Sequence, residues 1–229
     1  MCAGNSTDAM SSLSTYELIK LKIASFEYLP GTYLSESKLV ETLRVPRHKV
    51  REALVLLAQD NLIQTIPQKG TEVLKIDLED TLNSIFILKA LLIQLLQDLS
   101  QNISTSNKCV VELQNLISMD GANKNLSDFD FYYRDAQFYL ILSKASGFDR
   151  VTHIIAREKL HIERVLRLSL KSHLDFDSIK YFNQGILEGM KSQQATTSRR
   201  YVLELADELE RRVILAKQRY SYYFTNNEA

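Results

Sequence analysis

The chain has 229 residues, which suits two domains of roughly 75 and 150 residues that each bury a core. Its 28 basic and 28 acidic side chains balance, so the overall charge gives no support to a nucleic-acid partner. Cys2 and Cys109 are too few and too far apart in sequence for a disulfide framework or a metal-binding cysteine pair, which indicates a reducing compartment.

The N-terminal region is predicted to hold a tail followed by one helix. Residues 1–13 lack both the cationic and the apolar segment of a signal peptide, and we interpret them as a disordered tail. Apolar residues between 18 and 26 then repeat at helical spacing, and Pro30-Gly31 marks a stop. A helix over about 14–28 is therefore expected.

Two short amphipathic helices are predicted to meet across a tight turn. Apolar residues recur at helical spacing over 39–43, the pattern breaks at Arg44-Val45, and it resumes over 50–58. This arrangement is typical of a helix-turn-helix.

Two short strands are predicted next. Residues 62–66 and 71–74 are rich in apolar and β-branched side chains, and the segment 67–70 between them contains a proline and a glycine. Added to the two helices, this hairpin predicts a winged helix-turn-helix with a two-stranded wing.

The predicted motif makes double-stranded DNA the expected partner, because its second helix enters the major groove. The local charge supports this interpretation, since the turn and the second helix carry four cations and only one acid, Glu52. The residues expected to contact DNA lie around the turn, at the start of the second helix and in the wing: Ser35, Arg44, Arg47, His48, Lys49, Arg51, Lys69 and Gly70.

The order of these residues resembles the DNA-binding domain of the GntR family of bacterial transcription regulators. The resemblance covers roughly residues 14–75 and is carried by E-x-x-L-V, L-x-V-x-R-x-x-V-R-E-A-L, L-x-x-x-x-L-I and P-x-x-G-x-x-V. Two positions depart from the family's pattern: Arg44 stands at the usual turn glycine, and Pro46 stands at the usual Ser or Thr cap. A non-glycine residue in a left-handed turn and a lost cap each cost about 1 kcal/mol. Proline nevertheless suits the first helical turn.

After a linker at 76–80, residues 81–225 are predicted to form an all-helical domain, because no alternating apolar pattern bounded by turn residues follows the wing. Helices are expected near 80–102, 108–119, 127–146, 148–170, 175–191 and 195–222. The most apolar run, 85–96, is too short for a ~30 Å hydrocarbon core and contains Lys89, so we interpret it as a buried helix. The predicted fold class is mostly α: a winged helix-turn-helix followed by a helical bundle.

Part of this domain resembles the FCD, or FadR-like, subfamily of GntR regulators, many of which bind a divalent metal through one Asp and several His. Residues 135–139 resemble the subfamily's D-x-x-F-H, so Asp135 is kept and Tyr139 stands at a histidine position. The resemblance implies that Asn183 and Leu205 stand at two further histidine positions. A lone carboxylate beside a phenol, an amide and a leucine holds zinc or nickel poorly, so no metal and no cofactor are expected.

Two interpretations of this former metal site stay open. In one, Asp135, Tyr139, Asn183 and Leu205 line a metal-free pocket that binds a small organic effector, since bundle cores often host ligands. In the other, these side chains fill the site and the domain is a scaffold.

We expect a cytoplasmic, homodimeric regulator that acts as a repressor at an inverted-repeat operator and does not contact a membrane. The apolar breadth of the helix near 80–102 predicts that part of its surface lies in the dimer interface. One alternative is an architectural DNA-binding protein without an effector. Another is an enzyme that uses the C-terminal pocket, although the sequence shows no convergent acid, base or nucleophile and we predict no catalytic residue.

Overall fold

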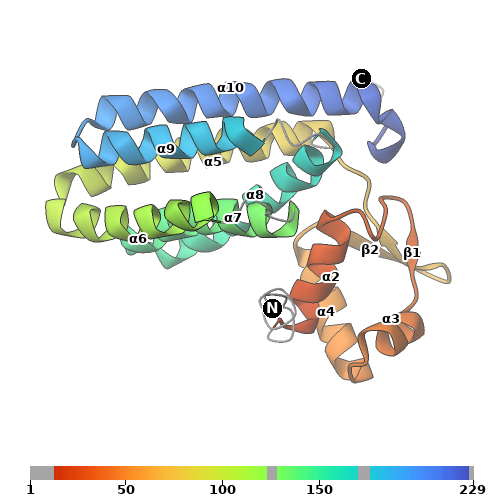
Figure 1. Cartoon of the computed structure of the whole chain (residues 1–229). Helices are drawn as coiled ribbons and strands as arrows, with labels where there is room; N and C mark the ends of the chain where they lie inside the picture. Colours follow the sequence, from red (N-terminus) through yellow and green to blue (C-terminus); the bar gives the residue numbers. More distant parts are fainter. Residues whose placement is uncertain (1–12, 123–127, 170–175, 227–229) are drawn as a thin grey trace. The chain divides into compact units, whose positions relative to one another are not determined.

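The computed structural model of the chain describes residues 13–122, 128–169 and 176–226 (Figure 1). The chain divides into two compact units, one of Met1–Asp77 with Tyr220–Ala229 and the other of Leu78–Arg219. We call them the winged unit and the helical unit. The predicted tail lies outside the described residues except for residue 13. The predicted mostly helical fold class is confirmed.

The winged unit combines helices with short strands. In chain order these are α2 (Thr15–Ala24), β1 (Tyr33–Leu34), α3 (Glu36–Leu43), α4 (Arg47–Gln59), β2 (Ile63–Ile66) and β3 (Gly70–Val73). A capping box starts α2, in which the Glu17 amide donates to Ser14 Oγ at 3.2 Å and the Ser14 amide donates to the Glu17 carboxylate at 2.7 Å. The helix ends earlier than the expected residue 28, because Phe26 takes a left-handed conformation with φ 60°.

The turn between α3 and α4 has the backbone geometry that the sequence predicts. Arg44 closes α3 in the left-handed region, with φ 52° and ψ 41°. Pro46 occupies the cap position of α4, with φ −59° and ψ 144°, and supplies no side-chain hydrogen bond to the helix. Ser35 caps α3, since its hydroxyl accepts a hydrogen bond from the Lys38 amide at 3.5 Å.

The sheet has three strands in the order β1-β3-β2, all antiparallel, where the sequence predicts only two. In the wing, Ile63 pairs with Val73 and Ile66 pairs with Gly70. The third strand, β1, pairs Tyr33 with Glu72. Because β1 has only two residues, it is too short to produce the alternating pattern from which a strand is recognised.

The segment after α10 belongs to the winged unit, so the prediction that residues 220–225 lie in the helical domain is wrong. Its backbone forms a parallel bridge with Ile76, whose amide donates to the Tyr223 carbonyl at 2.9 Å and whose carbonyl accepts from the Thr225 amide at 2.9 Å. Phe224 is fully buried, and the Tyr223 ring lies 5.5 Å from that of Phe26. This pairing joins residues far apart in the sequence, so no local pattern indicates it.

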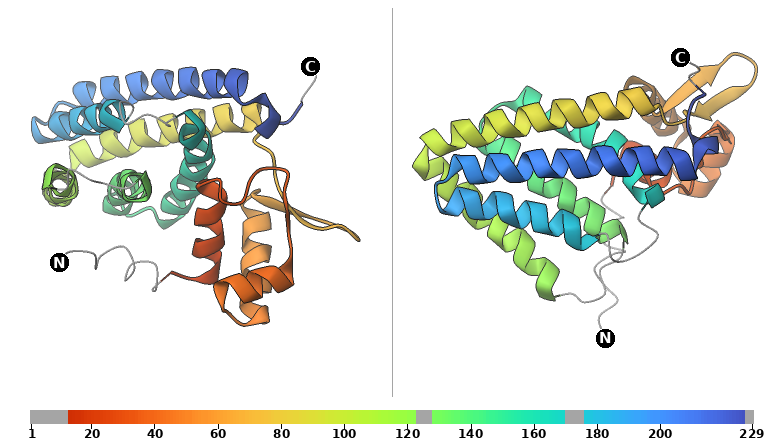
Figure 2. Two further views of the ribbon diagram at one scale, coloured as in Figure 1. Left: turned by 45° about the vertical axis from the view of Figure 1, so that its right-hand side comes forward. Right: turned by 90° about the horizontal axis from the view of Figure 1, so that it is seen from above.

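The helical unit is a bundle of antiparallel and crossing helices. Its elements are α5 (Leu78–Gln101), α6 (Ile103–Ala122), α7 (Asp128–Ala145), α8 (Asp149–Ser169), α9 (Phe176–Lys191) and α10 (Ala195–Arg219). Helix α10 packs along α5 and α9, and α8 packs against α5, α7 and α10 (Figure 2). Helix α6 begins at Ile103 rather than near 108, because Asn102 caps it by accepting from the Thr105 amide at 3.1 Å.

Helix α5 has one side in the core and one side exposed. Leu88, Leu92 and Leu95 are among its buried residues, whereas Phe86 is 63% exposed. Its 24 residues are long and apolar enough to cross a membrane by length and composition, a test that core helices of soluble proteins also pass. The apolar run 85–96 predicts a buried helix, and the buried leucines of α5 agree with a core position.

Helices α9 and α10 approach closely at two glycines. A Cβ built on Gly189 would lie 2.5 Å from the Ser198 backbone nitrogen, and one on Gly185 would lie 2.5 Å from Cγ of Tyr201. The Ser198 hydroxyl also donates a hydrogen bond of 2.9 Å to the Ile186 carbonyl. These contacts fix the hairpin between the two helices.

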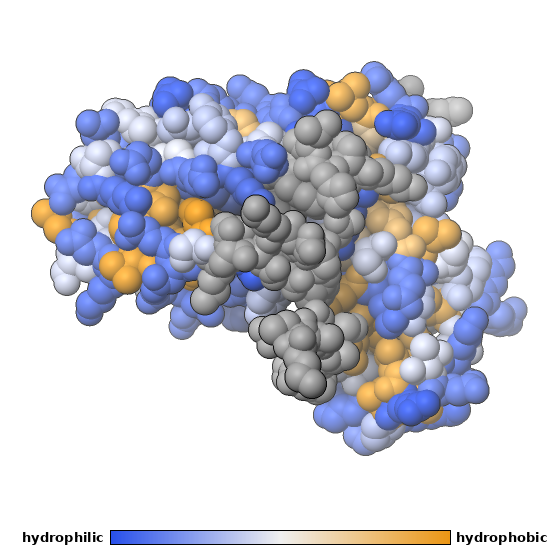
Figure 3. Space-filling model, in the orientation of Figure 1, coloured by the Kyte–Doolittle hydropathy of each residue, from blue (hydrophilic) through white to orange (hydrophobic). Residues whose placement is uncertain are grey.

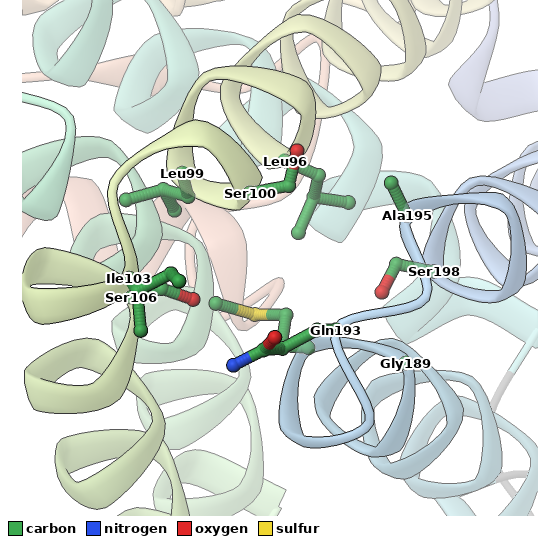
Figure 4. A pocket seen from close by; sticks show the side chains of 10 residues that line it. Leu96, Leu99, Ser100, Ile103, Ser106, Gly189, Gln193, Ala195 and Ser198 are labelled. Carbon is green, nitrogen blue, oxygen red and sulfur yellow. The ribbon is translucent and has the colours of Figure 1, made fainter.

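Two hollows of different kind occur in the helical unit. A small cavity of about 20 Å³ lies where the α5–α6 and α9–α10 turns meet, with Leu96, Ile103 and Ser198 in its wall, and it has room for a single water molecule (Figure 4). An open groove of about 630 Å³ is lined by side chains of α6, α9 and α10, including Tyr181 and Tyr201. Figure 3 shows apolar residues gathered over α6 and α9 on the face in view.

Candidate nucleic-acid interface

The first turns of α4 present a cationic surface whose opposite side is anchored in the core. Val50, Ala53 and Leu57 are buried. The side chains of the predicted contact residues on this helix are all exposed: Arg47, His48, Lys49 and Arg51. The helix therefore offers its charged N-terminal turns to a partner while its apolar side holds it in place.

Glu36, at the start of α3, pairs with two arginines of this surface. Its carboxylate lies 3.1 Å from Arg51 Nε and 3.3 Å from Arg47 Nε. Arg47 also donates from Nη2 to the Ser37 hydroxyl at 3.3 Å. Glu36 is not among the residues predicted from the sequence, and it adds a second acid beside Glu52 to the local charge balance. One signal in the sequence could have identified Glu36. It stands at the first position of α3, next to the helix that follows the tight turn.

Lys49 is paired within its own helix. Its ammonium lies 3.0 Å from the Glu52 carboxylate, and this hydrogen bond together with the charge of Lys49 lowers the pKa of Glu52. Arg47, Lys49 and Arg51 are thus each held by an acid. These ion pairs are solvent-exposed and weak, so phosphate oxygens can exchange with the carboxylates at little cost.

The other predicted contact residues are also exposed on the winged unit. Ser35 caps α3, and Arg44 lies in the left-handed turn between α3 and α4. Lys69 and Gly70 lie at the end of the wing, where Gly70 takes φ 105°, a conformation that glycine adopts without strain. The surface therefore extends from the α3–α4 turn to the wing.

Comparison with known proteins gives the same assignment as this geometry. Residues 12–73 match the family described as "Bacterial regulatory proteins, gntR family". The chain is 30% identical over 173 residues to the HTH-type transcriptional repressor RspR of Escherichia coli K12, covering 71% of this chain and 75% of that protein. The chain belongs to the GntR family. It is a DNA-binding transcription regulator with a helix-turn-helix.

Other relatives of this GntR regulator cover nearly the whole chain. An uncharacterized HTH-type transcriptional regulator in an unstable DNA locus of Streptomyces ambofaciens is 28% identical over 200 residues, covering 86% of this chain and 84% of that protein. Among solved structures, E. coli McbR/YncC aligns with a TM-score of 0.71 at 18% identity, over 90% of this chain and 96% of that one. A GntR transcriptional regulator from Rhodococcus sp. RHA1 aligns with a TM-score of 0.65 at 16% identity, covering 88% and 96%. These structural likenesses show a shared fold.

The helical unit of this GntR regulator holds the other group of predicted residues in a buried polar cluster. The Asn183 side-chain amide, on α9, donates to Asp135 Oδ1, on α7, at 2.8 Å. The Tyr139 hydroxyl donates to Asn183 Oδ1 at 3.1 Å. All three side chains are buried. Leu205, on α10, is 2% exposed, and its apolar side chain cannot join these hydrogen bonds.

Lys159, on α8, completes the cluster and is not among the residues predicted from the sequence. Its ammonium forms an ion pair with Asp135 Oδ2, lies 3.9 Å from the Glu163 carboxylate and lies 5.0 Å from the centre of the Tyr139 ring. Residues 157–159 are three consecutive charges, and successive helical residues are rotated by about 100°, so the three cannot share one narrow face of α8. Glu158 and Lys159 are buried and Arg157 is exposed, and no feature of the sequence indicates which of the three faces inward.

The cluster does not fit a divalent metal. The Lys159 ammonium already neutralises Asp135, the one carboxylate that the family resemblance implies as a ligand. Burial and the negative charges of Asp135 and Glu163 hold the pKa of Tyr139 well above its usual value, so its phenol stays protonated. Within the described ranges, no group of three His, Cys, Asp or Glu side chains could hold a metal ion. Neither hollow of the helical unit described above is lined by these residues.

Proposed function

We propose that this GntR regulator is a homodimeric repressor of the FCD type that reads an inverted-repeat operator through α4 and the wing. The observation that carries the proposal is the set of exposed cations on the first turns of a helix anchored by Val50, Ala53 and Leu57. In a helix-turn-helix, this part of the second helix reaches base edges.

Arg47 and Arg51 are the proposed base-reading residues. A guanidinium can donate two hydrogen bonds to guanine O6 and N7, and one good pair of this kind contributes about 1–3 kcal/mol of discrimination. Both arginines lie beside Glu36, which holds their guanidinium groups together on one side of α4. Lys49 and Lys69 are proposed phosphate contacts, which position the protein without reading sequence.

Homodimerisation is proposed because one winged unit offers few base contacts, whereas two related by symmetry read two half-sites. The exposed side of α5 supports it. Phe86 is 63% exposed on this side, and Ala90, one turn further along, is also exposed. Lys89 covers the Phe86 ring only in part, with its ammonium 5.6 Å from the ring centre. Light scattering at micromolar concentration should give the mass of a dimer, and a monomer mass would contradict the proposal.

The helical unit favours the scaffold interpretation over the effector pocket. Asp135, Tyr139 and Asn183 bond to one another and to Lys159, so they have few polar atoms left for a ligand. This observation supports an effector-independent regulator as the second candidate function. A thermal-shift screen with small organic acids tests it, because a saturating ligand raises the unfolding temperature. A reproducible shift would favour the effector-sensing alternative. We propose neither an enzymatic activity nor a membrane contact, and we propose a cytoplasmic location.

The experiment for DNA recognition is a titration of labelled duplexes selected from a random library, followed by fluorescence anisotropy. Arg47→Ala and Arg51→Ala should each weaken binding about 5- to 150-fold, the range that corresponds to one bidentate base contact. Arg211→Ala is a matched control, because Arg211 is an exposed arginine paired with Glu208 at 2.7 Å on the helical unit. It should bind like the parent. Parental affinity in both α4 variants would refute the assignment of α4.

A further inference from the structure

The polar cluster of the helical unit contains its own cation. Lys159 is 3% exposed, which is rare for lysine, because burying an ammonium is costly unless charge and hydrogen bonds compensate it. Compensation comes from two carboxylates, those of Asp135 and Glu163, and from the face of the Tyr139 ring. The ammonium is therefore held by three partners within the bundle core.

The cluster joins three helices. Lys159 projects from α8 to Asp135 on α7, and Asp135 in turn accepts a hydrogen bond from Asn183 on α9. A cation shared in this way ties together segments that are distant in sequence. The resemblance to the metal-binding subfamily implies a different link, because its Asp and His positions fall on α7, α9 and α10 of this chain, and a divalent ion held there would tie these helices together.

We infer that the Lys159 ammonium takes the place of that metal ion, so that α7, α8 and α9 are joined by a covalently attached cation. Asp135 keeps an electrostatic partner, and the histidines become dispensable. Tyr139 and Asn183 then stabilise the carboxylate–ammonium pair. Asn183 donates a hydrogen bond to Asp135, and the Tyr139 ring contacts the ammonium with its face. The inference concerns the helical unit alone and does not depend on the proposed mode of DNA binding.

A double-mutant cycle on thermal unfolding of the full chain tests the pairing. Lys159→Met keeps most of the side chain's length and leaves the Asp135 carboxylate without its cation, and Asp135→Asn leaves the ammonium with only the more distant Glu163 carboxylate at 3.9 Å. Each should lower Tm by about 6 °C or more, as expected for breaking a buried ion pair. The double variant should unfold above the temperature expected from adding the two losses, because both charges of the pair are removed together, and the loss of the Glu163 contact is already contained in Lys159→Met alone.

The cycle remains decisive if Lys159→Met alone does not fold. In the Asp135→Asn background, Lys159→Met should then give a protein that still folds. An additive loss in the double variant, or a double variant that also fails to fold, would overturn the inference. The matched control is Lys191 with Glu188, a pair at 3.6 Å whose side chains are 36% and 70% exposed. Its cycle, Lys191→Met with Glu188→Gln, should show almost no coupling.

Two further experiments distinguish a cation site from a side chain that only fills space. One adds a small molecule that replaces the group missing from Lys159→Ala, and the other measures the metal content of the parent. Measured relative to the parent in the same solution, Lys159→Ala should regain part of its lost Tm in n-propylammonium chloride and not in n-propanol or potassium chloride. Equal rescue by n-propanol would mean that only volume matters and would overturn the inference. Elemental analysis of the purified parent should find no stoichiometric zinc or nickel, and EDTA should leave its Tm unchanged. About one metal ion per chain, lost in Asp135→Ala, would also overturn it.

Discussion

Replacing Gly189 by alanine should destabilise the helical unit, although alanine is the better helix former. On propensity alone the change would add about 1 kcal/mol of stability. The new Cβ, however, would lie 2.5 Å from the Ser198 backbone nitrogen, and backbone atoms of α10 can give way only if the two helices separate. Overpacking of this kind costs about 1–3 kcal/mol. Separation would also weaken the 2.9 Å hydrogen bond from Ser198 to the Ile186 carbonyl, which contributes about 1 kcal/mol.

The net expectation for Gly189→Ala is a loss of about 2 kcal/mol, which lowers Tm by about 4–8 °C. Gly185→Ala is the matched control on the same helix. Its Cβ would meet the first ring atoms of Tyr201, a half-buried side chain that can leave only by changing its rotamer, so the loss of stability should be smaller than at Gly189, where the new Cβ meets backbone. Thermal unfolding followed by circular dichroism measures both. If Gly189→Ala is as stable as the parent or more stable, the close approach of α9 and α10 is wrong.

Three further predictions concern other parts of the chain. Glu36→Gln should tighten binding to unselected duplex DNA up to about tenfold at low salt, because it frees Arg47 and Arg51; unchanged affinity would show that the pairs do not restrain them. Phe224→Ala should cost the winged unit about 3–5 kcal/mol and weaken DNA binding, whereas an unaltered melting curve would contradict the docking of this segment. Burial, followed by the positive charge of Arg164, lowers the pKa of His161. The folded state thus binds a proton less readily than the unfolded state, and the unfolding free energy should fall as pH drops below about 6.5. His161→Asn should flatten this dependence in urea titrations between pH 7 and pH 5, and equal slopes would refute the assignment.

The winged unit could be predicted in detail because its signals are local. Helical spacing, the break at Arg44 and the hairpin residues each act within a few positions, and the left-handed turn follows from where the helices stop. Strand β1 could not be predicted from the sequence, because a strand of two residues is too short to show the alternation of apolar and polar side chains. The pairing of residues 220–225 with the winged unit could not be predicted either, because the partner residue, Ile76, is far away in the sequence. Local patterns do not report such long-range pairing.

The members of the polar cluster could also be predicted only in part from the sequence. Asp135, Tyr139 and Asn183 could be singled out by their resemblance to a known pattern, and the structure brings these three together by hydrogen bonds. Lys159 could not, since a lysine among charged neighbours on an amphipathic helix normally faces water. Only the packing of α8 inside the bundle decides which of its charges is turned inward.

The docking of residues 220–225 on the winged unit has a consequence for protein synthesis. The ribosome makes the chain from its N-terminus, so residues 13–77 emerge long before Phe224 is available to fill its place beside Ile76. All of Leu78–Arg219 must be translated in between, a delay of roughly ten to thirty seconds at bacterial rates. A nascent chain, or one broken off by a premature stop codon, therefore carries α3 and α4 without the buried ring that completes their domain. We therefore expect full DNA-binding strength only in molecules whose translation has passed residue 225.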